Sequence, residues 1–415
     1  MEQRLKTDFD NIIKTSNFNS DEIKKKKISL DKFLNDGLPS RKLENWKFSD
    51  LSQIINKKIG DLSFYNNYSQ NNEIDKKIYI QELDHNKIVI VNGRVSEINF
   101  ENEDLDKIKI SNDSQIDNYE IADNSLINLN NSLSDKTYTF KIDDNYHLKK
   151  PLIIYHISDN KLSSTNINLK LNFILKNNSC LKIIDLFREE SLKNFINIFY
   201  NFDLEKDSIL KNYKIDNKLN NNIRYSLNKI SQKENSIAEN FIFSSGSEFS
   251  KNEIFCNLEG KYSSAFINGV LSLSGERHHE IRSSVSHIVE NTKSYQLIKS
   301  VLDEKSKSVY QGKIFVNSEA QKTDGYQLSK AILLSENAEF NAKPELEIYA
   351  DDVKCSHGSA SGNLNEDSIF YLMSRGISYK SAKELLINGF LLDVVEKITD
   401  IEIKNFIKKV IGLKQ

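Results

Sequence analysis

Apolar and polar residues alternate in many short runs between about residue 78 and residue 357. Examples are KIVIV from Lys87, TNINLKLNFIL from Thr165 and KIFV from Lys313, and clusters of Asn, Asp, Ser and Gly separate such runs. Alternation with a period of two residues predicts β-strands that place one face in a core. Helix-length apolar patterns are missing between the runs, so the sequence does not predict a doubly wound α/β sheet.

The strands of this region can form a sandwich, a barrel or a β-solenoid. Their recurrence over so long a stretch, with Asn and Ser at the turns, favours a solenoid in which successive coils stack their side chains. A strict hexapeptide period is missing. The pattern alone therefore leaves the three architectures open.

The N-terminal end of the chain has a helical pattern. Leu5, Phe9, Ile12 and Ile13 form an apolar stripe, which predicts a first helix. A second helix is expected to end at Gly37, because Gly just past a helix end and a Pro two residues later are typical terminating residues.

The C-terminal end is also expected to be helical. After Gly362, Asn365 and Ser378 can cap two successive helices, and Ile401 to Ile411 form a last amphipathic segment. The patterns therefore predict three regions, which are residues 1–77 as a mainly helical region, residues 78–362 as a β core and residues 363–415 as a small helical bundle.

Cys355 and His357 lie where the β pattern ends. Side chains two residues apart on a strand share a face, and their Cα atoms are about 6.6 Å apart. A closed zinc or iron–sulfur site needs about four sulfur or nitrogen ligands. The pair is therefore half of a metal site whose missing ligands we expect from another chain, or else Cys355 is an inert packing residue.

Composition and charge exclude several classes of function. The chain has 57 basic and 59 acidic residues, interspersed, so neither nucleic acid nor an anionic membrane is an expected partner. The N-terminus has no apolar signal segment, and no apolar run is long enough to cross a membrane, so we expect neither export nor a membrane span. The three cysteines include no C-x-x-C pair, which fits a cytoplasmic, reducing environment and argues against a disulfide framework.

Motifs for nucleotide binding and for hydrolysis are also missing. Gly260-Lys261 and Gly312-Lys313 lack the upstream Gly and the following Ser or Thr of a phosphate-binding loop. The motifs G-x-G-x-x-G, G-x-S-x-G and H-E-x-x-H do not occur. We therefore expect that this chain binds no nucleotide and is not an enzyme.

The other two cysteines are expected to be structural, and so are His279 and His287. On one continuous strand, His279 and His287 would be about 26 Å apart, too far to share a metal ion. Cys180 and Cys256 lie within β-like runs and are expected to be buried small residues.

Several long motifs resemble the SufB/SufD family of iron–sulfur cluster assembly proteins. The string DDVKCSHGSASG, with LNEDSIFYLMSRGI and AKELLINGF after it, is similar to the family's most distinctive block. The stretch SVYQGKIFVNSEAQKTDGYQLSKAILLSENAEFNAKPELEI and the N-terminal GLPSRKLENWKFSDL are also similar. Gly358 after His357, and the absence of further cysteines, resemble the SufD branch more than the SufB branch.

The resemblance implies a fold and partners. The fold would be a right-handed parallel β-helix flanked by N-terminal helices and a C-terminal helical bundle. The chain would be a scaffold subunit that pairs with SufB through the β-helices, while its C-terminal helical region docks the SufC ATPase, which hydrolyses ATP. The residues that we expect in the SufC-docking surface are Phe370, Tyr371, Arg375, Gly376, Leu385 and Phe390.

The resemblance also implies a metal role for the pair of residues in the Cys-x-His segment. Cys355 and His357 match the family's Cys and His near the SufB–SufD junction, where His357 would help hold iron or a nascent cluster with a SufB cysteine. The stretch from Arg277 to Glu280 departs from the Asp-His pair expected there, so no role is transferred to it. The sequence gives no basis for a flavin site.

Three alternatives accompany this interpretation. The chain can be an inert structural partner of SufB whose Cys355 and His357 only pack. A β-helix carbohydrate-active enzyme is a second alternative, but it would need export and a pair of acidic groups that the sequence does not show. Without SufB, the open edge of a β-helix also favours a homodimer.

Overall fold

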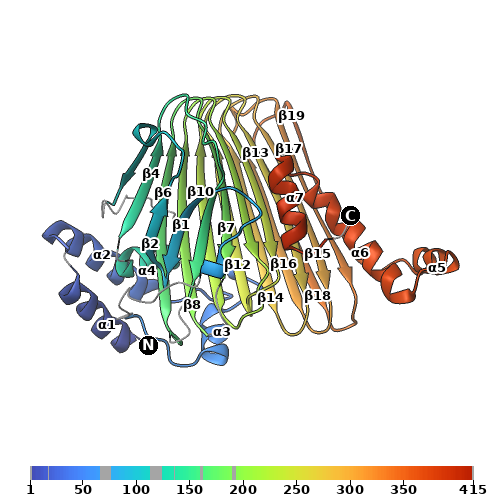
Figure 1. Ribbon diagram of the computed structural model, residues 1–415, viewed down its shortest axis with the longest axis horizontal. Helices are drawn as coiled ribbons and strands as arrows, with labels where there is room; N and C mark the ends of the chain where they lie inside the picture. Colours follow the sequence, from blue (N-terminus) through green and yellow to red (C-terminus); the bar gives the residue numbers. More distant parts are fainter. Residues whose placement is uncertain are drawn as a thin grey trace.

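The computed structural model describes residues 2–16, 18–65, 76–112, 124–134, 136–158, 162–188 and 193–413. Its centre is a β-solenoid of about eight turns. Figure 1 shows the strands side by side in chain order, with the N-terminal helices at one end and the C-terminal helices near the other. The predicted β-helix with helical ends is therefore confirmed.

The strands form two sheets, and each coil contributes one strand to each sheet. The ten-stranded sheet consists of β1 (Asn86–Val91), β2 (Arg94–Asn99), β5 (Leu152–Ile157), β7 (Cys180–Phe187), β9 (Ile209–Asp216), β11 (Ile237–Ser244), β13 (Ser264–Leu273), β15 (Lys293–Leu302), β17 (Thr323–Leu333) and β19 (Val353–Gly362). The nine-stranded sheet consists of β3 (Ile108–Ser111), β4 (Thr137–Ile142), β6 (Asn166–Leu175), β8 (Phe195–Leu204), β10 (Ile223–Gln232), β12 (Phe249–Leu258), β14 (His278–His287), β16 (Lys307–Val316) and β18 (Glu339–Ile348).

Neighbouring strands pair in parallel, apart from the antiparallel pairs β1–β2 and β3–β4 at the N-terminal end. The pairs β15–β17 and β17–β19 continue without a register shift to the last coil. Parallel pairing in constant register stacks equivalent side chains along the solenoid. A residue's neighbours in the adjacent coils can therefore be read from its register partners.

One turn recurs once per coil and explains why the chain coils regularly. A Ser or Thr hydroxyl donates to the carbonyl three residues earlier, and the residue just before it has a positive φ between 52° and 64°. Asn and Asp, which tolerate this left-handed conformation, occupy most of those preceding positions. The hydroxyl residues are Ser179, Ser208, Ser236, Ser263, Thr292 and Thr323.

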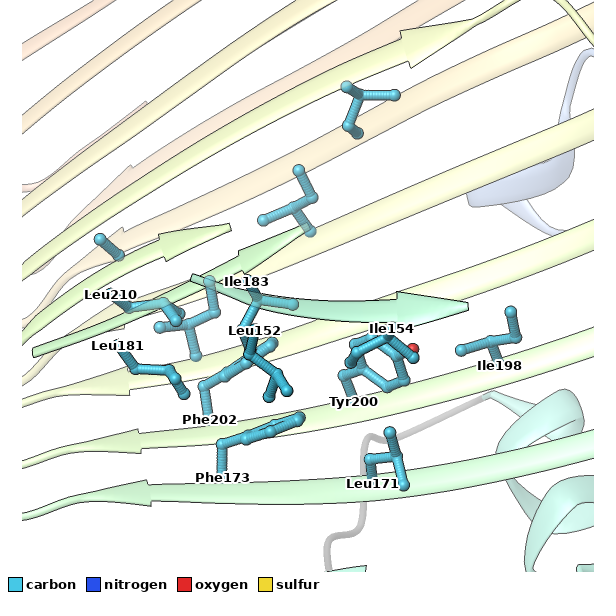
Figure 2. Packing of buried hydrophobic residues seen from close by; sticks show 14 of the residues in the cluster. Leu152, Ile154, Leu171, Phe173, Leu181, Ile183, Ile198, Tyr200, Phe202 and Leu210 are labelled. Carbon is cyan, nitrogen blue, oxygen red and sulfur yellow. The ribbon is translucent and has the colours of Figure 1, made fainter. Parts of the chain in front are cut away.

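Apolar side chains from both sheets meet in the lumen between them. Figure 2 shows Leu152 of one sheet close to Phe173 and Phe202 of the other. The rings of Phe140, Phe173 and Phe202 stack in successive coils with centroids 5.3 Å and 5.2 Å apart. Burial of these aligned side chains is the main source of stability for the solenoid.

The N-terminal helices cover the outer face of the nine-stranded sheet. Trp46, the only tryptophan, is 1% exposed, and its ring stacks on Tyr225 at a centroid distance of 5.8 Å. It therefore anchors this region to the sheet. The helices are α1 (Glu2–Thr15), α2 (Ser20–Asp36), α3 (Leu51–Lys58) and α4 (Ser125–Leu133).

The helix α4 was not predicted, because its segment lies within the region expected to be β. Its nine residues, SLINLNNSL, contain five Asn and Ser residues with low helix propensity. Asn124 caps it, and Asn130 donates to the backbone carbonyls of Leu169 and Asn197. Packing against β6 and β8 therefore determines this helix more than local propensity does.

The C-terminal helices are α5 (Glu366–Ser374), α6 (Tyr379–Val395) and α7 (Ile401–Val410). Asn365 and Ser378 cap α5 and α6 as the sequence predicts. The second half of α6 packs with α7 on the outer face of the ten-stranded sheet. None of the helices in the described ranges has both the length and the apolar character needed to cross a membrane.

Candidate functional site at the open end of the β-helix

The last coil of the solenoid is uncovered. β18 and β19 are the final strands of their sheets, and each is paired on one side only. Most residues of β8, deep in the solenoid, are buried, whereas β18 and β19 have no buried residue. The lumen is therefore open at this end, and two strand edges are available for pairing.

Cys355 and His357 lie on β19 and point toward the lumen side of the sheet. Their register partners on β17 are Gly325 and Gln327. A Cβ atom placed on Gly325 would lie 3.4 Å from the Cys355 sulfur and 3.4 Å from a methyl group of Ile314, which is a lumen residue. Cys355 is half-buried and His357 is exposed.

The environment of the Cys355 thiol keeps it protonated in the isolated chain. Burial raises the pKa of this thiol and outweighs the opposing effect of a hydrogen bond with the Gly325 backbone, while the Asp324 carboxylate adds a smaller increase. A raised pKa makes the thiol a poor nucleophile near neutral pH. Coordination of a metal ion would remove the proton, because the thiolate is the form that binds metals.

The pair does not form a complete metal site within the chain. Among the residues that the structure describes, no group of three or more His, Cys, Asp or Glu side chains is placed to hold a metal ion. Two adjacent ligands at an open end still leave room for ligands from outside. A metal role for the pair therefore stays a prediction.

A second exposed feature lies beyond the strands. Helix α5 and the first half of α6 project away from the solenoid, and we call residues 366–385 the helical projection (Figure 1). Phe370, Tyr371 and Leu385 on this projection are 74%, 57% and 51% exposed. So many exposed large apolar groups on one element are typical of a protein interface.

The other residues expected in the docking surface lie at the tip and at the base of the projection. Arg375 is exposed, with its guanidinium 5.3 Å from the centre of the Tyr371 ring, and Gly376 has a φ of 86° where α5 ends. Phe390 is half-buried near the sheet, and the Lys299 ammonium lies 4.4 Å from the centre of its ring. Phe390 therefore lies where α6 is anchored.

Comparison with known proteins agrees with the motifs. The family model described as "SUF system FeS cluster assembly, SufBD core domain" matches residues 157–390, which is more than half of the chain. The chain belongs to the SufBD family.

Relatives of this SufBD-family protein are iron–sulfur cluster assembly proteins. The SufD protein of Escherichia coli is 27% identical over 92% of this chain and 90% of its own length. A SufBD-family protein of Synechocystis is 24% identical over 87% of this chain and 84% of its own. The SufD protein of Bacillus subtilis is 31% identical over 34% of this chain and 32% of its own. The similarity to SufD proteins supports a role in iron–sulfur cluster assembly.

In this SufBD-family protein, the residues that follow the projection attach it firmly to the solenoid. The Lys299 ammonium on β15 donates to the Phe390 carbonyl at 2.8 Å and to the Asp393 carboxylate at 2.7 Å. Lys182 on β7 pairs with Asp400, the N-cap of α7, at 2.6 Å. At its other end the projection joins β19 through only three residues, 363–365. The projection is therefore directly connected to the strand that carries Cys355 and His357.

His279 and His287, which the sequence analysis expected to be structural, are structural in this family member. His279 is fully buried, with hydrogen bonds of 2.8 Å to the Ser244 hydroxyl and 2.7 Å to the Ser247 carbonyl. His287 is fully buried between the hydroxyls of Thr292 and Ser294. Burial lowers the pKa of each to about 4, so both are neutral at pH 7.

The other two cysteines differ from each other in exposure. Cys256 is fully buried in the lumen, as predicted, and burial raises the pKa of its thiol to about 12. Cys180 is only partly buried, because it begins β7 next to the turn at Ser179. The expectation of full burial for Cys180 is therefore wrong.

A cleft of about 430 Å³ lies between the face of the ten-stranded sheet and the connection from α6 to α7. Phe266, Tyr295 and Tyr326 form a ladder along its wall, and the centroids of the two tyrosine rings are 5.3 Å apart. Glu239, one of its two acidic lining residues, accepts a hydrogen bond from the Thr399 hydroxyl at 2.9 Å. That carboxylate helps to hold the α6–α7 connection in place.

Sequence reasoning missed two exposed residues of the projection and one buried neighbour of Cys355 and His357. Met373 and Tyr379 are 45% and 52% exposed beside the predicted docking residues. Gln327 lies directly beside His357 in the sheet. The apolar periodicity of the helices could have indicated the first two, whereas only the register of β17 and β19 shows the third.

Proposed function

We propose that this protein is the SufD-like scaffold subunit of a SUF complex, which pairs with a SufB paralogue and binds SufC ATPase. The observation that carries the proposal is the position of Cys355 and His357, side by side on an uncovered strand. A partner that covers this end of the solenoid would complete both the lumen and the metal site. The chain itself would catalyse no reaction.

Iron or a nascent cluster is the cargo in this proposal. A thiolate and an imidazole are suitable ligands for iron and for iron–sulfur clusters. Cys355 would lose its proton when it binds, and His357 would bind through one neutral ring nitrogen. The remaining ligands, including a cysteine, would come from SufB, so that binding of the cargo is transient and depends on the interface.

SufC would act through the helical projection. Phe370, Tyr371 and Leu385 would provide the apolar part of its docking surface, and Arg375 the charged part. Association of two SufC subunits on ATP binding would move the projections of SufB and SufD relative to each other. Because the projection joins β19 through a short connection, this movement would open the interface that holds the cargo.

The direct test is His357→Ala in the co-expressed complex. We expect assembly of the complex to be unchanged and the cluster content to fall by about 10-fold or more, because a ligand is lost. The matched control is His147→Ala, since His147 is also exposed but lies far along the chain, where its ring contacts the Asn178 carbonyl at 3.0 Å. Normal cluster content in an intact His357→Ala complex would refute the metal role.

An inert structural role is the alternative, and the reactivity of Cys355 distinguishes the two. We expect the thiol to resist alkylation in the closed complex with SufB and to react when ATP opens the complex. Equal labelling in both states would favour the inert role. Three free cysteines also fit a cytoplasmic location.

Without SufB, the same surface would pair with a second copy of this chain. The two uncovered edges of β18 and β19 are self-complementary in a two-fold dimer. The homodimer would be exchanged for the SufB pair when SufB is present. Size measurement of the isolated chain, with and without SufB, tests this.

A further inference from the structure

Gln327 is a buried polar residue next to the candidate site. It lies on β17 as the register partner of His357 and is 1% exposed. Both its amide oxygen and its amide nitrogen lack a hydrogen-bond partner among the described residues. A buried amide in this state costs free energy of folding, and here it lies directly beside His357 in the sheet.

The opposite wall of the lumen leaves space for this amide. A Cβ atom on Gly312 would lie only 2.1 Å from the Gln327 amide oxygen and 2.5 Å from the Tyr310 hydroxyl oxygen. Any other residue at position 312 would therefore displace the amide. Glycine at this position therefore makes room for the Gln327 amide and the Tyr310 hydroxyl.

The polar groups deeper in the lumen bond mainly to one another, but the Gln296 amide nitrogen, in register with Gln327, also lacks a hydrogen-bond partner among the described residues. The Tyr310 hydroxyl donates to the Gln296 amide oxygen at 3.0 Å and lies 3.1 Å from the Ser283 hydroxyl. Gln327 lies between Gln296 and His357 in register, so its amide is available to either of these two neighbours.

His357 lacks the support that a metal-binding histidine normally has. Its ring forms no hydrogen bond with any residue in the described part of the chain. A ligating histidine usually donates its second ring N–H to a carbonyl or carboxylate, which fixes both its tautomer and its orientation. Neighbouring strands are about 4.8 Å apart, so a glutamine side chain one strand inward can reach the imidazole.

We propose that Gln327 is the positioning residue for His357, accepting a hydrogen bond from one ring nitrogen through its amide oxygen and leaving the other nitrogen for the metal cargo. The inference rests on the proposed function, because it assigns a support to a ligand of that site. Closure of the lumen by a partner would exclude water and strengthen this hydrogen bond.

The test uses three variants of the full chain. Gln327→Leu removes the acceptor and keeps a similar volume, and Gln327→Glu keeps an acceptor oxygen. The matched control is Ser329→Ala, because Ser329 lies two residues along the same strand, is 2% exposed and donates to the Ser359 hydroxyl on β19 at 3.1 Å.

The readouts are Zn²⁺ affinity, the tautomer of the His357 ring by nitrogen-15 NMR, and the melting temperature. We expect Gln327→Leu to melt at or above the wild-type temperature, because replacing a buried amide by an apolar side chain outweighs the loss of one hydrogen bond to an exposed ring. Its Zn²⁺ affinity should fall by about 10- to 100-fold, and both His357 tautomers should be populated. Gln327→Glu should keep a single His357 tautomer and most of the Zn²⁺ affinity. Ser329→Ala should match the wild type in its His357 tautomer and in its Zn²⁺ affinity.

A purely structural role gives the opposite pattern. A lower melting temperature with unchanged Zn²⁺ affinity and an unchanged single tautomer in Gln327→Leu would overturn the proposal. If Gln327→Leu does not fold, loss of the single tautomer in a folded Gln327→Glu would overturn it. Failure of the proposed function is seen separately, as normal cluster content of the His357→Ala complex.

Discussion

The two ends of the solenoid differ in how they are finished. At the N-terminal end the hairpin β1–β2 and the short strand β3 cover the first coils, and Phe100 closes the lumen with its ring 6.5 Å from Phe140. At the C-terminal end nothing in the described chain covers β18 and β19. The apolar residues Ile348 and Tyr349 there are 38% and 65% exposed.

The difference shows which end awaits a partner. A chain that can close one end with its own residues has no need to leave the other end open, unless that end is completed by another molecule. Open strand edges favour aggregation and are normally covered. Cys355 and His357, the candidate metal ligands predicted from the sequence, lie at the open end. The open end is therefore both the expected interface and the expected chemical site.

The largest expected difference between the two ends is in packing energy. Phe173→Ala, in the closed part of the lumen, should reduce the free energy of unfolding by about 3–5 kcal/mol, because a fully buried ring is lost. Phe340→Ala on β18 should cost about 1 kcal/mol in the isolated chain, because its ring is only partly buried.

Urea unfolding of the two variants measures this difference. Equal losses would mean that the last coil is as well packed as the interior. Addition of the SufB partner should increase the cost of Phe340→Ala and leave the cost of Phe173→Ala unchanged.

A smaller effect is expected in the pH dependence of stability. This dependence reports whether water enters the closed part of the lumen. The pKa of His287 is about 4 in the folded chain and about 6.5 in an unfolded chain. Between these values the unfolded state binds more protons, so stability is lost as the pH falls from about 6.5 to about 4.

His287→Gln should remove this contribution. The slope of the unfolding free energy should decrease by up to about 1.4 kcal/mol per pH unit in that range. Above about pH 7 the difference between wild type and variant should be constant, which is the internal control. An unchanged slope at pH 5 to 6 would show that water reaches His287 in the lumen.

Much of the fold could be predicted from the sequence, because its signals are local. The caps at Asn365 and Ser378, the helix end at Gly37 and the alternation in the strands all depend on neighbouring residues. The sequence of the turn that contains Ser or Thr varies between coils, because Asn, Asp, Tyr and Lys all occupy the left-handed position. The sequence therefore shows no clear repeat from which the coil length could be read. The choice of a solenoid therefore came from the family resemblance.

The candidate site was predictable only in part. Cys355 and His357 share a face because they are two residues apart on one strand, which the sequence shows directly. Gln327 and Gly312 become their neighbours only through the register of β17 with β19 and of the two sheets across the lumen. The length of each coil determines which distant residues come into contact. The alternation of apolar residues does not reveal that length.

Hydrogen exchange of the backbone amides tests the central claim most directly, by comparing the isolated chain with the complex that contains the SufB paralogue. The account predicts that amides of β18 and β19 exchange more slowly in the complex, while those of the edge strands β2 and β3 at the closed end are unchanged. Protection of β2 and β3 with no change in β19 would show that the partner binds the other end, and would contradict the account.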